Sequence, residues 1–596
     1  MRNSNNPQVL IKLIYRLWSH FSLKQKNQIF LLLLLMVLAS ASEALSIGAV
    51  IPFLAVIVSP QKVFDHQDFQ ILINYFGITT PSELVFILTL FFGFAALVAG
   101  GVRVFLLWRN IQFSFMSGVD WSASIYKRSL YQPYLINISR NSSEIINGIS
   151  GKASALTNTV LMLLNLVASG LMLFVLLATL FQINAWVTFL SCAGFGFVYM
   201  GIAFVTRKRL MVESQIIARE STNVIKALQE GLGGIRDVTI DGTQEFYCNL
   251  YRYADYPHRR AYAITGFISQ APRFIIEALG MLMMAFLAFI LVKDPGGMEL
   301  AIPILGAFAL GAQRLLPLLQ QAFSAWANIK SNQASLQDAL DLLDQPLPES
   351  MDVVDDSPIQ FNDQIQVKNL TFQYFEGCSY VIKDVNFSIK KGSCIGFIGS
   401  TGSGKSTLLD IIMGLLPPTS GFIAIDNQIL TPKNSRSWQK LVAHVPQTIF
   451  LSDATILENI ALGIPKDAID IDFAWKCVKR AKIDSLIESL PFGFMTTVGE
   501  RGVRLSGGQR QRIGIARALY KRASILVFDE ATSALDSETE EEVMDALKGL
   551  RTELGSDLTV LIIAHRISTL KNCSNIYKLV NGALMGNLNY ENLDGK

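Results

Sequence analysis

Six long apolar segments constrain the fold of this chain more than any other feature. They cover about 28–58, 84–108, 158–181, 185–205, 263–292 and 300–328. Each is longer than the roughly 20 residues that an α-helix needs to cross a bilayer. Of the 596 residues, 51% are hydrophobic and only 17% are charged, which is typical of a chain partly buried in lipid. We therefore predict an all-α, six-helix transmembrane domain over 27–330.

Lysine and arginine are unevenly distributed over the connections between these segments. The N-terminal segment and the second and fourth connections are rich in them, whereas the first, third and fifth connections are poor. Because cations are retained on the cytoplasmic side, both termini are predicted to be cytosolic. We expect an integral, multi-pass protein of a bacterial inner membrane. The polar start, with no small-residue cleavage site before the first apolar run, argues against a removable signal peptide.

Polar segments border and connect the predicted spans. Residues 1–26 contain the amphipathic Ile11–Trp18, so we expect an interfacial segment on the inner membrane surface. Residues 331–362 are predicted to be a linker, because Pro-containing turns interrupt a stretch of little apolar content. The long connections near 109–157 and 206–262 are expected to be helical extensions, each with a short transverse helix at its tip. We place the second tip near Glu230–Asp237.

Three ionisable residues in or near the predicted spans are candidates for a substrate path. Glu43 lies about halfway along the first apolar segment, where an acidic side chain must face protein or a watery cavity. Arg314 lies next to a helix-kinking proline in the last segment, which also favours an internal position. A packing partner for Glu43 such as Arg103 is an equally weighted alternative, and Arg103 can instead extend to the cytosolic edge.

A phosphate-binding loop dominates the C-terminal half. It is the sequence Gly399–Ser406, between the strand-like Cys394–Ile398 and a helix-like segment that starts at Thr407. Glycines let the backbone N–H groups and the helix N-terminus approach phosphate oxygens. The predicted ATP-binding residues of the loop are Gly399, Ser400, Thr401, Gly402, Ser403, Gly404, Lys405, Ser406 and Thr407. We assign Lys405 to the β- and γ-phosphates and the Ser406 hydroxyl to Mg²⁺.

Two carboxylates follow a second buried strand. In Ile525–Glu530 the strand ends on Asp529, which is predicted to hold Mg²⁺, and Glu530, which is predicted to polarise the attacking water. A loop that only binds nucleotide would not need the second carboxylate, so we predict hydrolysis. Ser506–Gln509 opens a helix with small residues and forms a second anion-binding end. Strands and helices alternate over 363–596, which predicts an α/β domain with a mixed sheet.

In their order and combination these motifs resemble those of ABC transporters of the exporter type, in which one membrane half is fused to one nucleotide-binding half. The resemblance covers the whole chain and implies a P-loop ATPase domain with a helical subdomain, and a homodimer. It implies roles for further residues: Tyr374 stacks on adenine, Gln447 is catalytic and senses Mg²⁺, and Glu500 lies in the segment that couples to the membrane half. The signature that closes on the γ-phosphate is then Ser506, Gly507, Gly508 and Gln509, while Asp536 crosses the dimer and the catalytic His565 holds the γ-phosphate.

The membrane half is similar to the branch that flips lipid-linked oligosaccharides or exports related glycolipids. The likeness rests on Ser42–Leu45, Ile51–Leu54, a short outer segment near Phe69–Phe76, and Arg314–Pro317. It implies membrane lipids as partners and a lipid-like or amphipathic substrate. Export of hydrophobic drugs, lipids or peptides is the alternative, and an ATP-gated channel or a regulatory membrane protein is a remote one. The net charge of +3 is too small for this length to argue for nucleic acid.

Overall fold

The chain folds into two compact units. The computed structural model describes residues 7–49, 79–183, 185–293, 297–347, 359–530, 558–564 and 566–588, together with residues 53, 56, 57, 61, 64, 538, 540, 541, 543, 545 and 590. The helical unit comprises Met1–Tyr131 and Arg140–Pro346, and the α/β unit comprises Gln132–Ser139 and Leu347–Lys596. The predicted outer segment near Phe69–Phe76 lies outside the described residues.

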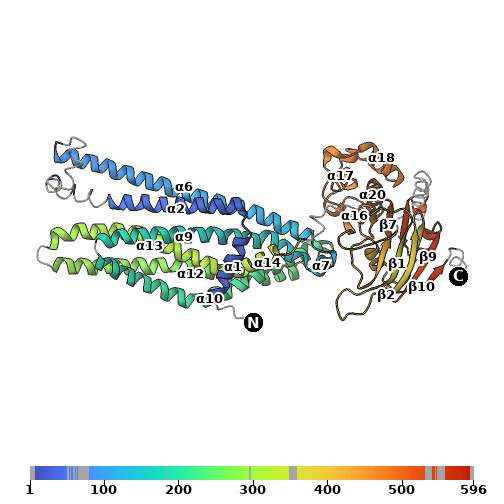
Figure 1. Cartoon of the computed structure of the whole chain (residues 1–596), viewed down its shortest axis with the longest axis horizontal. Coiled ribbons are helices and arrows are strands. Elements are labelled where there is room, and N and C mark those ends of the chain that lie inside the picture. The colour runs from blue at the N-terminus through green and yellow to red at the C-terminus, as the bar shows by residue number, and fades with distance from the viewer. Residues whose placement is uncertain are drawn as a thin grey trace. The chain divides into compact units, whose positions relative to one another are not determined.

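Long helices build the helical unit (Figure 1). They are α2 (Leu23–Gly48), α6 (Pro81–Leu130), α9 (Ala153–Ile183), α10 (Ala185–Gly233), α12 (Gln244–Lys293) and α13 (Gly297–Ser331). Each overlaps one of the six predicted apolar segments. Within the described residues, three stretches are long and apolar enough to cross a bilayer: Leu23–Ser46, Pro81–Leu130 and Ser142–Thr179. The length and composition of these helices favour a membrane domain, and the count of six spans stays a prediction.

Three of the long helices extend well beyond an apolar span. α6 and α12 have 50 residues each and α10 has 49. At 1.5 Å per residue, such helices are about 75 Å long, which exceeds the roughly 30 Å hydrocarbon core. This agrees with the expected helical extensions. At the second tip, α10 continues to Gly233 and the short α11 (Ile235–Ile240) follows, slightly later in the chain than predicted.

The shorter helices close one end of the unit. They are α1 (Pro7–Ser19), α8 (Ser142–Asn147), the π-helical turn η1 (Gly148–Lys152) and α14 (Gln333–Leu343). α1 and α14 share an apolar core with α2, α6 and α9, in which Met36, Leu156 and Leu336 are fully buried. The predicted linker over 331–362 is thus helical over 333–343. Leu336, Ala339, Leu340 and Leu343 recur at helical spacing and are buried, which explains the difference.

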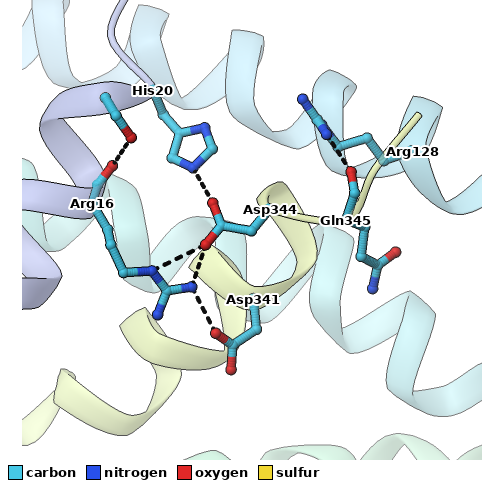
Figure 2. A network of polar contacts seen from close by, with 7 residues as sticks. Arg16, His20, Arg128, Asp341, Asp344 and Gln345 are labelled. Carbon is cyan, nitrogen blue, oxygen red and sulfur yellow. Dashed lines mark hydrogen bonds and ion pairs between the residues drawn. The ribbon is translucent and has the colours of Figure 1, made fainter. Parts of the chain in front are cut away.

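A polar network ties α1 to α14 (Figure 2). The Arg16 guanidinium donates to Asp341 Oδ1 (2.7 Å) and, through Nε, to Asp344 Oδ2 (3.0 Å). His20 Nε2 lies 2.6 Å from Asp344 Oδ1. Nearby, Arg128 donates to the backbone carbonyl of Gln345. Burial raises the pKa of Asp344, but the hydrogen bonds and charges of Arg16 and His20 outweigh it and hold that pKa below its ordinary value.

The α/β unit contains two sheets. The first is antiparallel, with the order β2 (Ile382–Lys390), β1 (Gln364–Phe372), β4 (Ser420–Ile425), β5 (Gln428–Ile429). The second has the order β10 (Ala583–Leu588), β9 (Asn575–Val580), β3 (Cys394–Ile398), β8 (Thr559–Ile563), β7 (Ile525–Asp529), β6 (Val442–Val445). Its strands are parallel except for the antiparallel β9–β10 pair. The predicted α/β domain with a mixed sheet is confirmed.

Helices pack against these sheets. They are α7 (Tyr134–Ser139), α15 (Lys405–Ile412), α16 (Ser435–Lys440), α17 (Ile456–Ile460), α18 (Ile471–Arg480), α19 (Asp484–Ser489) and α20 (Gly507–Tyr520). Residues of α17, α18, α19 and α20 join one buried cluster with residues of β6, β7 and β8. The carboxyl ends of β3, β8 and β7 lie at one edge of the parallel sheet, and the predicted nucleotide residues follow two of these strands.

Candidate functional site

The phosphate-binding loop leaves the middle of the six-stranded sheet. β3 pairs in parallel with β8 and β9, and α15 begins at Lys405, directly after the loop. The residue that precedes the helix, Gly404, has a φ of 100°, a conformation that L side chains rarely adopt. A Cβ there would lie 2.9 Å from the carbonyl oxygen of Val381. The position therefore requires glycine, and the loop has the close wrap that phosphate binding needs.

Two buried polar side chains of the loop fit a phosphate ligand. Lys405 is 5% exposed, and its Nζ donates to the carbonyl oxygens of Gly399 (2.8 Å) and Ser400 (3.0 Å). Ser403 is 3% exposed, and its Oγ has no hydrogen-bond partner within the described part of the chain. A buried hydroxyl without a partner costs free energy, and a phosphate oxygen would accept a hydrogen bond from it. The residues present therefore fit the phosphate groups of ATP.

Side chains from three elements converge beside the loop. Ser406 Oγ, at the start of α15, donates to Asp529 Oδ1 (3.2 Å) at the end of β7. Gln447, after β6, donates through Nε2 to Glu530 Oε2 (2.7 Å). Glu530 has a φ of 52°, an uncommon conformation that recurs at functional sites. The hydroxyl, amide and carboxylate oxygens of Ser406, Gln447 and Asp529 are ligands that Mg²⁺ prefers.

The site holds several carboxylates, and the single positive charge of Lys405 does not balance them. Burial raises the pKa of Asp529 and the charge of Glu530 adds to this, whereas the hydrogen bond from Ser406 and the charge of Lys405 act in the opposite direction. Burial, together with the charge of Asp529, raises the pKa of Asp410 to about 6. Asp410 was not predicted as a site residue. The feature of the sequence that could have indicated Asp410 is its position as an acidic residue within the apolar run of α15.

Tyr374 lies beside the loop, as predicted, but its contacts are with protein. Its hydroxyl is 3.0 Å from Thr407 Oγ1, and its ring meets Phe372 edge to face at 5.1 Å. The side chain is half-buried against the core between the sheets, and Leu135 of α7 packs against the same core. Burial raises the pKa of the nearby Tyr134, and the charges of Asp410 and Tyr374 add to this. The stacking of Tyr374 on adenine stays a prediction.

The predicted signature forms the N-terminus of α20. Ser506 Oγ accepts from the Gln509 N–H (3.2 Å), and Gln509 Oε1 accepts from the Ser506 N–H (2.8 Å), a capping box. Glu500 begins the short 3-10 turn Glu500–Gly502 before it. Within the described part of the chain these contacts are local, and they do not join the signature to the phosphate-binding loop. Asp536 and His565 lie outside the described residues, so their predicted roles stay predictions.

In the helical unit the three substrate-path candidates meet. Glu43 on α2 is 4% exposed, and its Oε1 accepts from Arg314 Nη1 of α13 at 2.5 Å. Arg103 Nη1 of α6 lies 3.6 Å from the same oxygen. The packing alternative named Arg103 as the partner, and the structure gives Arg314 as the closer one. Glu43 is buried, whereas the side chains of Arg103 and Arg314 are 38% and 42% exposed, and a role of the cluster in substrate binding stays a prediction.

Comparisons with known proteins identify both halves. The profile of the ABC transporter transmembrane region matches residues 28–310, and the ABC transporter profile matches residues 382–533. The ATP-dependent lipid A-core flippase of Francisella novicida is 30% identical over 475 residues, which cover 77% of each chain. The chain belongs to the ABC transporter family. The transporter is thus an integral membrane protein of the exporter type, a half-transporter whose ATP-binding domain couples hydrolysis to transport.

Further relatives point the same way. The ATP-dependent lipid A-core flippase of Cupriavidus metallidurans is 27% identical to the transporter over 483 residues, with 79% of each chain covered. A solved structure of a bacterial Atm1-family ABC exporter with ATP bound aligns with a TM-score of 0.75. That alignment covers 95% of the transporter and 96% of the solved chain at 22% sequence identity, and it shows a shared fold.

Proposed function

We propose that the transporter is a homodimeric flippase that moves a lipid-linked oligosaccharide or a related glycolipid from the inner to the outer leaflet. The observation that carries this proposal is the cluster of Glu43, Arg103 and Arg314, placed among apolar helices. Charged groups inside a membrane domain are costly and are retained where a polar group must pass. A purely hydrophobic cargo would not need them. The relatives named lipid A-core flippases act on a glycolipid by name, which supports this choice.

The α/β unit supplies the energy in this proposal. Lys405 and the loop amides would hold the β- and γ-phosphates, Tyr374 would stack on adenine, and Ser406, Gln447 and Asp529 would hold Mg²⁺. The ion would neutralise charge on the transferring phosphoryl group. Glu530 would accept a proton from the attacking water, and its contact with Gln447 holds the carboxylate in place for this step.

A second copy would complete each site. Among the described residues the hydrogen bonds of the signature Ser506–Gln509 are local, and its helix N-terminus is suited to an anion. In the dimer it would close on the γ-phosphate bound to the other copy, together with the predicted Asp536, while His565 would hold the same phosphate from its own side. ATP binding would then convert the membrane halves from inward- to outward-facing, and hydrolysis would reset them. Glu500 would lie where the two domains communicate.

The membrane arrangement follows the six long helices. We propose that α2, α6, α9, α10, α12 and α13 each cross the bilayer once, with both termini and the α/β unit in the cytosol. The cation-rich connections at the predicted inner side support this orientation. Among the described residues α1 exposes Ile11, Tyr15 and Trp18 on one surface, which suits a helix lying at the membrane interface.

Reconstitution tests the substrate class. We expect ATPase activity in proteoliposomes to rise with a polyprenyl-diphosphate-linked oligosaccharide and to change little with cationic amphipathic drugs. Flipping of a fluorescent derivative should require ATP and disappear in Glu530→Gln. Stimulation by the drugs alone would overturn the flippase proposal in favour of drug export.

A further inference from the structure

Two cysteines of the α/β unit meet at one edge of the parallel sheet. Cys394 is the first residue of β3, and Cys573 lies in the short connection that precedes β9. Both are thiols in this structure, and their sulfur atoms are 3.1 Å apart although the residues are separated by 179 positions. The fold therefore builds this contact from distant parts of the chain, and the nucleotide site described above does not use it.

Backbone contacts hold the two cysteines in this arrangement. β3 and β9 are parallel neighbours, with Ile395 opposite Asn575. Ser574, the residue after Cys573, donates to the carbonyl oxygen of Cys394 through its N–H (2.8 Å) and through its Oγ (2.9 Å). Because an S–S bond is about 2.05 Å long, the sulfur atoms need to approach by only about 1 Å to form one.

The two thiols differ in exposure. Cys394 is 3% exposed and belongs to a buried core, whereas Cys573 is partly exposed at the border of that core. The Cys573 sulfur lies over β3, since a Cβ added to Gly396 would come within 3.5 Å of it. An oxidant from solution therefore reaches Cys573 first, and Cys394 lies next to it. Redox-sensing cysteines have the same arrangement, an accessible thiol beside a second one that resolves the first product.

We propose that Cys394 and Cys573 form a reversible disulfide, a modification site that stabilises the α/β unit when the surrounding thiol pool becomes oxidised. Disulfides of cytosolic proteins are usually transient and catalytic or redox-sensing, which suits a pair of adjacent thiols in a unit proposed to be cytosolic. The disulfide does not depend on what the transporter moves, so its failure would leave the proposed function intact.

The bond forms by thiol–disulfide exchange with a small-molecule disulfide such as oxidised glutathione. The Cys573 thiolate attacks one sulfur of that molecule, so a mixed disulfide forms and one small thiolate leaves. Cys394 then gives up its proton and attacks Cys573 Sγ, which forms the Cys394–Cys573 bond and releases the second small thiolate. The two cysteines are oxidised, the small disulfide is reduced, and the two thiol protons end on the released thiolates.

The crosslink would close a loop of chain that contains the nucleotide site. The phosphate-binding loop, the signature and both carboxylates that follow β7 lie between Cys394 and Cys573 in the sequence. A crosslink over so many residues strongly restricts the unfolded chain, and this stabilises the folded state. The bond would form where β3 and β9 begin, whereas the phosphate-binding loop follows the end of β3. The ATPase rate is therefore expected to stay the same.

The test uses the full-length protein in detergent, incubated with either dithiothreitol or oxidised glutathione. Remaining thiols are alkylated, and peptide mapping without reduction identifies linked cysteines by mass spectrometry. Thermal unfolding of the α/β unit and ATPase activity are measured on the same samples. The variants are Cys394→Ala and Cys573→Ser, which each remove one thiol of the pair. The matched control is Cys378→Ser, since Cys378 is an exposed thiol of the same unit.

In the oxidised wild type we expect peptides that join Cys394 to Cys573, and an unfolding midpoint about 5–10 °C above that of the reduced protein. Dithiothreitol should reverse both changes. Cys394→Ala and Cys573→Ser should show neither the link nor the rise, and their ATPase activity in dithiothreitol shows that they are folded. Cys378→Ser should behave like the wild type.

Three results would overturn the proposal. The first is an oxidised wild type without the Cys394–Cys573 link, a measurement that needs no variant to fold. The second is a link without a rise of the unfolding midpoint, which would remove the stabilising role. The third is a rise that persists in Cys573→Ser, which would assign the stabilisation to other cysteines.

Discussion

The two units treat buried charge in opposite ways. In the α/β unit Asp410, Asp529 and Glu530 gather around the phosphate-binding loop, and the pKa values of the first two are raised by burial and by neighbouring carboxylates. In the helical unit the buried Glu43 lies between Arg314 (2.5 Å) and Arg103 (3.6 Å). The carboxylates of the nucleotide site therefore need a cation such as Mg²⁺ to balance their charge, whereas the carboxylate of Glu43 is already paired with two arginines of its own unit.

Removing the carboxylate that acts on water should have the largest effect. Glu530→Gln keeps the shape of the side chain and its position beside Gln447 but cannot accept a proton. General-base groups contribute about 100- to 10,000-fold, so we expect ATP turnover to fall by at least about 100-fold while bound ATP is retained. Steady-state ATPase assays and retention of radiolabelled ATP measure both. Glu488→Gln, an exposed acid in the same unit, is the control, and near-normal turnover in Glu530→Gln would refute the assignment.

Breaking the membrane cluster should mainly destabilise the fold. Glu43→Gln leaves two arginines without their carboxylate, and removal of one partner from a buried ion pair costs about 3–5 kcal/mol. Both arginines are partly exposed, so we expect about 3 kcal/mol, read as a clear fall of the thermal unfolding midpoint in detergent. Glu230→Gln, which removes an exposed partner of Lys226, should change the midpoint little. An unchanged midpoint in Glu43→Gln would show that the ion pairs of Glu43 do not stabilise the fold.

The dependence of stability on pH should reveal the excess of carboxylates in the α/β site. The pKa of Asp410 is about 6 in the folded state and 3.8 ordinarily, so the folded protein binds more protons between about pH 4 and pH 6. Stability is therefore lost as the pH rises through that window and stays level above it. Asp410→Asn should remove this loss and stabilise the α/β unit at pH 7.5 by on the order of 1 kcal/mol, after allowance for the partial exposure of Asp410.

Calorimetry of the full chain between pH 4.5 and 7.5 measures this effect. Asp453 is exposed, and Asp453→Asn serves as the control, because it should not change how stability depends on pH. Mg²⁺ and ATP should reduce the difference in stability between wild type and Asp410→Asn, since the cation balances the charge of the same carboxylates. If the stability of wild type and of Asp410→Asn depended on pH in the same way, the charge imbalance inferred for this site would be contradicted.

The smallest effect is expected at the exposed tie between α1 and α14. Asp344→Asn weakens the contacts with Arg16 and His20, and exposed ion pairs contribute about 0.2–1 kcal/mol. Because the pKa of Asp344 is held below its ordinary value, its contribution is present at neutral pH and is lost as the pH falls through the acid range. Thermal unfolding at low salt should show a slight loss that fades in 1 M salt, with Asp237→Asn as the control. A loss that persists in high salt would show that packing, not charge, is responsible.

Local chemistry made the α/β unit predictable from the sequence. A phosphate-binding loop needs its glycines and lysine within eight residues, and Asp529 and Glu530 directly follow a buried strand. The pairing of the loop with those carboxylates then follows from the parallel order of β3, β8 and β7. The sequence analysis missed Asp410 as a third carboxylate, and it could not show the hydroxyl contact of Tyr374 with Thr407. Both depend on how α15 and the strand end pack.

Long-range contacts explain what was missed in the helical unit. Glu43 and Arg314 were each selected from the sequence, but they are separated by 271 positions, and apolar periodicity does not say which helices meet. The helix α14 lies in the stretch predicted to be a linker. The prolines at 346 and 348 that follow it indicate turns, whereas its leucines are buried at helical spacing.

The tie between α1 and α14 has a practical consequence. Arg16 and Asp344 are 328 positions apart, so their contact closes the helical unit into a ring just before the chain enters the α/β unit. Deleting the first twenty residues would open that ring and leave Asp341 and Asp344 without Arg16 and His20 at the junction. A shortened protein of this kind would retain every catalytic motif and every long helix. It would nevertheless lose the contacts that hold α14 to the N-terminal helix α1 within the helical unit.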